Sequence, residues 1–168
     1  MNMLYAQIIG AAAMLIMILS VQCNKKKNIL LVQAISNLLY FIQYILLNAF
    51  SAATLNLITI LRNICFYSYD KKNKNIPTWL LILFIIIILL IGKFVYSNVL
   101  DLIPIFITVM YTIGASCKNT NNFRKVFLGC SFLWIIYNFS VNAFVGVFGN
   151  IFEIVSISIA LYRYKNNN

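Results

Sequence analysis

The stretch Asn48-Ala49-Phe50 organises this chain, because it returns as Asn142-Ala143-Phe144, and in both copies another Asn follows eight residues after the first. The two copies lie 94 residues apart, and shifting the chain over itself by 94 pairs residues 4–74 with residues 98–168 without a gap. Thirteen of the 71 pairs are identical. The sequence therefore predicts two similar units joined by a linker.

Composition places the chain in a membrane. Its 168 residues are 62% hydrophobic and 10% charged, and the mean hydropathy is +0.90, whereas soluble domains are about 45–50% apolar and about 25% charged. Backbone polar groups in lipid must be satisfied within helices or closed barrels, and long apolar runs favour helices. We expect an all-α integral membrane protein with the lipid bilayer around it.

Charge and cysteine usage argue against several function classes. The net charge of +10 comes from short basic clusters between apolar runs, not from a basic face with interleaved aromatics of the kind that binds nucleic acid. Four cysteines without a histidine provide no zinc-ligand spacing and no Cys-His nucleophile. No nucleophile-base set or carboxylate pair shares one depth in the predicted spans. We expect no enzyme, cofactor, metal or nucleic-acid partner.

Apolar runs between the Lys and Asn clusters predict seven membrane spans. Each has 18 or 19 residues, which at about 1.5 Å per residue crosses a hydrocarbon core of about 30 Å. The predicted spans are residues 4–21, 29–47, 51–69, 78–96, 99–116, 124–142 and 146–163.

The basic residues predict the orientation, because positive charge next to a span resists translocation. With seven spans and the N-terminus outside, Lys93 is the basic residue left on the outer side. The inner side receives Lys25, Lys26, Lys27, Lys71, Lys72, Lys74, Lys118, Arg124, Lys125, Arg163 and Lys165. We expect a multi-pass membrane protein with an external N-terminus and a cytoplasmic C-terminus.

The repeat and the span count together predict a 3+1+3 plan. Residues 1–74 form the first three-helix repeat, residues 75–97 the linker helix, and residues 98–168 the second repeat. An odd number of spans per repeat plus one linker makes the two repeats parallel, with a pseudo-twofold axis along the membrane normal. Within each repeat, Asn48 or Asn142 occupies a short uncharged hairpin, where we expect its side chain to cap the following helix.

Asn56 and Asn150 are the first candidate binding residues. Each lies several residues inside a predicted span, where an unpaired amide costs several kcal/mol, so both should face the bundle interior at one depth. That placement suits a solute site between the repeats. The alternative is that they join helices, since a membrane hydrogen bond contributes about 0.6–2 kcal/mol.

An aromatic residue stands sixteen positions before each of these amides, Tyr40 before Asn56 and Trp134 before Asn150. In a helical hairpin that turns near residue 48, positions 40 and 56 share one membrane level. A ring beside an amide suits a neutral polar solute, because the ring takes its apolar face and the amide its hydroxyls. The alternative is ordinary packing.

The chain resembles the SWEET and SemiSWEET sugar transporters and their wider group of PQ-loop and PnuC-type proteins. The resemblance is in the 3+1+3 plan, the Asn in the third and seventh spans, and the aromatic residue sixteen positions before each Asn. A closer resemblance, to the YgjV family of bacterial inner-membrane proteins, covers nearly the whole chain. It is carried by Gln7-Ile8-Ile9-Gly10, Lys25-Lys26-Lys27, Ile35-Ser36-Asn37-Leu38-Leu39, Leu55-Asn56-Leu57-Ile58 and Leu61-Arg62-Asn63. The wider resemblance implies alternating access at the repeat interface.

The hinge departs from the SWEET pattern. Those carriers place a Pro near the inner end of the first span of each repeat, where this chain has Val21-Gln22 and Ala115-Ser116. Pro104 instead lies early in the fifth span, and its repeat partner is Gly10. Either residue can loosen a helix, so we expect the hinge at Gly10 and Pro104.

Glu153 and Arg62 are the candidate ion pair. Glu153 lies three residues beyond Asn150 on nearly the same helix face, and an ionisable group within a span is a functional candidate. One hypothesis pairs Glu153 with Arg62 across the central path. In the other, Arg62 extends to the inner headgroups while Glu153 bonds a hydroxyl such as that of Ser156.

The preferred interpretation is a carrier for a small neutral polar solute such as a sugar, nucleoside or vitamin. The alternative is a non-transporting scaffold, receptor or regulator on the same helix plan. A central cavity reached by Asn56 and Asn150 favours the carrier, whereas direct contact between the two amides favours the scaffold.

Overall fold

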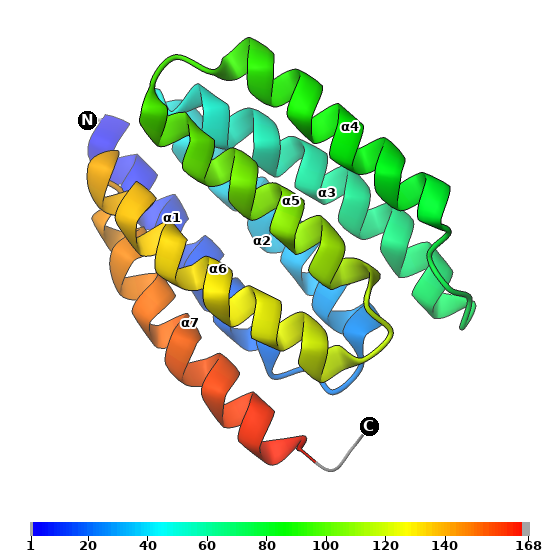
Figure 1. Ribbon diagram of the computed structural model, residues 1–168. Coiled ribbons are helices and arrows are strands. Elements are labelled where there is room, and N and C mark those ends of the chain that lie inside the picture. Colours follow the sequence, from blue (N-terminus) through cyan, green and yellow to red (C-terminus); the bar gives the residue numbers. More distant parts are fainter. Residues whose placement is uncertain (1, 166–168) are drawn as a thin grey trace.

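Helices account for nearly all of the chain in the computed structural model, which describes residues 2–165 (Figure 1). This part of the chain forms seven α-helices and one short 3-10 helix. They are α1 (Asn2–Val21), α2 (Lys26–Leu46), α3 (Phe50–Lys71), α4 (Thr78–Val95), η1 (Val99–Asp101), α5 (Leu102–Ser116), α6 (Thr120–Ser140) and α7 (Phe144–Arg163). The predicted spans correspond one to one with the α-helices.

Six of these helices are long and apolar enough to cross a membrane, and α6 is the exception. Its first two turns carry Asn121, Asn122, Arg124 and Lys125, which lower its hydropathy. The predicted span at 124–142 left out the first four residues of this helix. The polar start of α6 packs inside the protein, because Asn121 and Arg124 are buried. All seven helices nevertheless lie side by side in one bundle (Figure 1).

The helices pack as a ring of six with one helix outside it. Within the first half of the chain α2 lies between α1 and α3, and within the second half α6 lies between α5 and α7. The two halves meet where α1 packs on α7 and where α3 packs on α5. α4 packs against α3 and α5 at the outer edge of the bundle (Figure 1). Both halves therefore border one central space.

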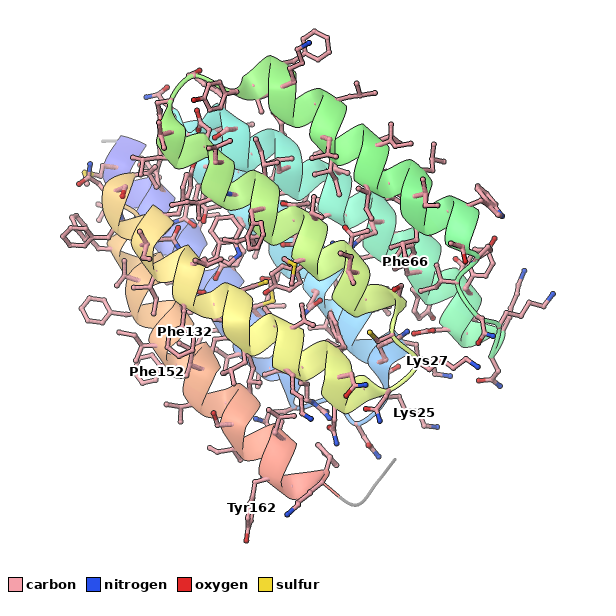
Figure 2. All side chains as sticks on the ribbon, viewed as in Figure 1. Lys25, Lys27, Phe66, Phe132, Phe152 and Tyr162 are labelled. Carbon is pink, nitrogen blue, oxygen red and sulfur yellow. The ribbon has the colours of Figure 1, made fainter. Side chains whose placement is uncertain are left out.

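The outer surface of the bundle is apolar, as a lipid environment requires. Large hydrophobic side chains such as Phe132 and Phe152 are 54% and 58% exposed and lie on the outer side of α6 and α7 (Figure 2). Polar residues within the membrane-spanning helices concentrate inside, where most find a partner. The described chain therefore has the polarity of a membrane bundle, with lipid as the medium around it.

The two hairpins at Asn48 and Asn142 have the same structure, which corrects their expected role. Neither Asn side chain caps the following helix. Both residues instead have a left-handed backbone, with φ of 57° and 58°. In the first hairpin the amide of Ala49 donates to the carbonyl of Tyr44, and in the second that of Ala143 donates to Asn138, at 2.9 and 2.8 Å. This is the Schellman end of the preceding helix, and Asn tolerates its left-handed position better than most residues.

Two ends of the bundle can now be defined. The hairpin end carries residues 47–49, 96–101 and 141–143, and the lysine end carries residues 22–25, 72–77 and 117–119 with the end of α7. Lys25 and Lys27 project from the lysine end (Figure 2). Charge is therefore concentrated at one end of the bundle, as the sequence predicted, while which membrane face this end occupies stays a prediction.

The Schellman hairpins predict a difference between Asn48→Ala and Asn48→Gly. The left-handed backbone conformation costs alanine about 1–2 kcal/mol, whereas glycine adopts it without this cost. We expect Asn48→Ala to lower the thermal unfolding midpoint in detergent and Asn48→Gly to leave it unchanged or higher. If the Asn side chain were instead the stabilising element, both variants would lose stability equally.

Candidate functional site

A central cavity lies between the two halves of the ring. It provides about 50 Å³ for the centres of water-sized molecules, and about 10–15 Å³ by this measure holds one water, so there is room for a few. Its lining includes six of the eight predicted site residues. The full lining is Met17, Gln33, Asn37, Tyr40, Tyr44, Asn56, Thr59, Arg62, Ile107, Thr108, Tyr111, Phe127, Trp134, Asn138, Asn150 and Glu153.

Most lining residues occur in pairs that are 94 positions apart. Twelve of the sixteen form six such pairs, each with one member from either half of the chain. The pairs are Met17 with Tyr111, Gln33 with Phe127, Tyr40 with Trp134, Tyr44 with Asn138, Asn56 with Asn150, and Thr59 with Glu153. Equivalent positions of the two halves therefore face one shared space.

The lining side chains follow from helical periodicity. On α2 they stand at positions 33, 37, 40 and 44, with spacings of four, three and four residues that place them on one helix face. On α6 the equivalent positions 127, 134 and 138 line the cavity. Each half therefore presents the same stripe of its middle helix to the cavity.

Asn56 and Asn150 both face the cavity and make no direct contact with each other among the hydrogen bonds of the described chain. Asn56 Nδ2 donates to the Ala52 carbonyl one turn earlier on α3, at 2.9 Å. Asn150 lies in the equivalent place on α7 and is 9% exposed. Both amides thus keep hydrogen-bonding capacity that a molecule in the cavity can use.

The aromatic residues form a wall on one side of the cavity. The Tyr44 ring stacks between those of Tyr40 and Trp134, with ring centres 6.2 and 5.9 Å away. Tyr44 Oη also donates to Asn138 Oδ1 at 2.6 Å, joining α2 to α6. Because Tyr44 and Asn138 are equivalent positions, this bond crosses the boundary between the halves. Tyr40 and Trp134 are the predicted aromatic pair, and the ring between them was not predicted.

Arg62 and Glu153 line the same cavity, but the expected ion pair is absent from the described chain. Of its alternative, the hydroxyl bond to Glu153 is present and the extension of Arg62 to the headgroups is not. Arg62 is 1% exposed, so it does not extend to headgroups. It donates to Thr112 Oγ1 at 3.0 Å and to Asn63 Oδ1 at 2.8 Å. Glu153 accepts from Ser131 at 2.8 Å rather than from Ser156. These bonds give the two charged groups separate neutral partners.

Gly10 and Pro104, the two residues of the predicted hinge, do not line the cavity. A Cβ on Gly10 would overlap the side-chain amide of Gln43, so this glycine permits close packing of α1 on α2. Pro104 is in the first turn of α5, where a missing N–H breaks no helical bond and produces no kink. A hinge at these two residues stays a prediction.

One unsatisfied group points to an occupant of the cavity. Gln33 is buried and lines the cavity, and its Nε2 has no hydrogen-bond partner in the described chain. Burying an amide without a partner costs about 1–3 kcal/mol by protein mutational data. A water or a polar solute in the cavity would supply the missing acceptor.

Sequence reasoning missed Gln33, Asn37, Tyr44 and Asn138 as lining residues. A signal was present, because positions 33, 37, 40 and 44 share one face of α2. A polar stripe within an apolar span marks the face turned to the protein interior. Extending the search from Tyr40 along this face, and then by 94 residues to Asn138, would have found them.

A family model described as a bacterial inner membrane protein, Imp-YgjV, matches residues 4–168. The chain belongs to this family. The sequence resemblance to the YgjV family is thereby confirmed, together with a location in the bacterial inner membrane. No curated protein and no solved structure matches the chain. The contacts in this YgjV-family protein therefore carry the functional argument.

The bond between Tyr44 and Asn138 predicts a specific loss of stability in this YgjV-family protein. Tyr44→Phe keeps the stacked ring but leaves a buried amide oxygen without its donor, which costs about 1–2 kcal/mol. Tyr40→Phe is the matched control, because its hydroxyl takes part in none of the described bonds. We expect a lower thermal midpoint for Tyr44→Phe than for Tyr40→Phe. Equal midpoints would show that the bond contributes nothing.

Proposed function

We propose that this YgjV-family protein is a carrier that moves a small neutral polar solute by alternating access. In this proposal the chain consists of two parallel three-helix repeats, α1–α3 and α5–α7, and α4 joins them. The six pairs of equivalent residues around the central cavity carry the proposal. Parallel repeats of this kind also occur in SWEET proteins, and transporters commonly bind substrate near the midplane at the repeat interface.

The helix contacts agree with twofold related repeats. The contact of α1 with α7 becomes that of α5 with α3 when positions are shifted by 94, and both contacts occur. At the hairpin end, the amide of Val145 donates to Gln7 Oε1, while Ser51 donates to Asp101. Asp101 is equivalent to Gln7 and Val145 to Ser51, so the two bonds join equivalent positions. This relation supports the 3+1+3 arrangement.

The lining chemistry supports a neutral polar solute. Tyr40 and Trp134 provide ring surface for an apolar face, and Asn56 and Asn150 provide amide donors and acceptors on the facing helices. Arg62 is the one positive and Glu153 the one negative group of the lining. Since each has neutral partners of its own, the cavity presents no net charge for a charged solute to neutralise.

A cavity between the amides also supports the carrier over the scaffold. A scaffold would use Asn56 and Asn150 to join helices directly, whereas each lies against the cavity in the described chain. A void beside polar side chains contributes no packing, so it has to be explained by an occupant. Opening of the cavity to each membrane face in turn would give that occupant a path.

Uptake into proteoliposomes tests this function. We expect one solute from a panel of sugars, nucleosides and vitamins to accumulate, and Asn56→Ala or Asn150→Ala to reduce its uptake by about tenfold or more, since loss of a hydrogen bond with an unpaired partner costs about 1–3 kcal/mol. Asn122→Ala is the matched control, because Asn122 is exposed at the lysine end. Failure of every solute with folded protein would reject the carrier in favour of a scaffold.

Orientation is tested separately. The proposal places the N-terminus outside and the lysine end, with the C-terminus, in the cytoplasm. We expect a C-terminal green fluorescent protein fusion to fluoresce and a C-terminal alkaline phosphatase fusion to be inactive, with the opposite pattern for fusions within residues 96–98. If the activities of the two fusions were the opposite at both positions, the N-terminus and the C-terminus would exchange sides, but the cavity argument would be unchanged.

A further inference from the structure

Lys26 ties the two halves of the ring together at the lysine end. It lies in the first turn of α2 and is 6% exposed. Its Nζ donates to the carbonyl oxygens of Ala115 and Cys117 at the end of α5, at 3.1 and 2.7 Å. The same Nζ lies 3.1 Å from Asp70 Oδ1 on α3. The ammonium group of Lys26, in the first half, therefore binds the C-terminal end of α5, in the second half.

Arg124 makes the reciprocal connection. It lies in the second turn of α6 and is 1% exposed. Its Nε and Nη2 donate to the carbonyl oxygens of Val21 and Cys23 at the end of α1, at 3.3 and 2.8 Å. The guanidinium carbon lies 4.8 Å from the centre of the Tyr164 ring. The guanidinium group of Arg124, in the second half, therefore binds the C-terminal end of α1, in the first half.

The partners of the two cations occupy equivalent positions. Shifted by 94 residues, Val21 becomes Ala115, Cys23 becomes Cys117, and Asp70 becomes Tyr164. The cations themselves are not equivalent, since Arg124 lies one turn further along its helix than Lys26 along α2. The two halves thus keep the same acceptors and reach them with different donors. Recurrence of the acceptors in both halves indicates a constraint beyond local packing.

Helix electrostatics explain why each half needs the other's cation. Free carbonyl groups at a helix C-terminus carry partial negative charge. Neither α1 nor α5 has a basic residue in its own last turn. Lys26 and Arg124 supply that charge from the opposite half, and the carbonyls compensate two cations that would otherwise be buried without partners.

Both cations lie between the central cavity and the lysine end. Lys26 precedes the cavity residue Gln33 by seven positions on α2, or about 10 Å along the helix, and Arg124 precedes Phe127 by three on α6. Ile29, three residues beyond Lys26 on α2, and Phe123, next to Arg124 on α6, are fully buried. Any opening of the cavity toward the lysine end has to separate the halves at the two cations.

We propose that Lys26 and Arg124 are paired latches that hold the central cavity closed at the lysine end and that release when it opens there. This proposal rests on the carrier function, because alternating access requires such an opening. Release is reversible, because water that enters from the lysine end replaces the carbonyl oxygens as partner of both cations. The latches add no barrier at the hairpin end.

Cysteine accessibility tests the latches without relying on transport. In a background with Cys23, Cys65, Cys117 and Cys130 changed to Ser, Thr59→Cys places a reporter thiol in the cavity. Lys74→Cys, in a separate protein, identifies which membrane face is the lysine end. Labelling by a membrane-impermeant maleimide is then measured from that face in oriented vesicles.

We expect Lys26→Ala or Arg124→Ala to raise the labelling rate of the reporter from the lysine end about tenfold or more, as expected for removal of one charged hydrogen bond from the closed state. Lys25→Ala and Lys125→Ala are matched controls, because both residues are exposed neighbours, and should leave the rate unchanged. Labelling from the hairpin end should not rise.

Milder variants keep the test valid if a latch variant does not fold. Asp70→Asn keeps the shape but removes the counter-ion of Lys26, and Tyr164→Leu removes the ring beside Arg124, so each should raise labelling by a smaller factor. Folded latch variants with unchanged labelling would overturn the proposal. Increased labelling without uptake of any solute would keep the latches and reject the carrier, whereas uptake with unchanged labelling would do the reverse.

Discussion

Lipid supplies no hydrogen-bond partners, and this constraint shapes every polar feature of the bundle. Backbone groups are satisfied within helices, and some of the carbonyl groups left free at helix ends are satisfied by side chains of the opposite half. Lys26 and Arg124 illustrate the second case, since each cation meets carbonyl oxygens of a helix from the other half. A soluble protein would leave such carbonyls to water. Here their compensation also fixes how the two halves meet.

The same constraint explains which part of the fold the sequence predicted. Spans and their ends follow from apolar run length, and six of the seven helices satisfy that criterion in the structure. α6 does not, because its polar start is buried against α1 and α7 rather than facing lipid. Hydropathy measures the average side chain of a helix and carries no information about which neighbour a polar residue meets.

Sequence periodicity predicted which residues share one cavity, but not which side chains bond to each other across it. The repeat placed Asn56, Asn150, Tyr40 and Trp134 at one level, and all four line one cavity. The pairing of Glu153 with Arg62 was wrong because each side chain found a neutral partner within 3.0 Å, Ser131 in one case and Thr112 in the other. Sequence spacing predicts the depth and the helix face of a residue. Which neighbour its side chain bonds depends on separations of a few ångströms between helices.

The bond from Tyr44 to Asn138 joins two different side chains at equivalent positions of the two halves. Because these residues are equivalent and in contact, they lie beside the pseudo-twofold axis of the proposed repeat. An assembly of two identical three-helix chains would have to place the same side chain on both sides of that axis. A phenol donor facing an amide acceptor becomes available only when both halves belong to one polypeptide and mutate independently. Fusion into a single chain thus permits a chemically directional centre that a homodimer cannot encode.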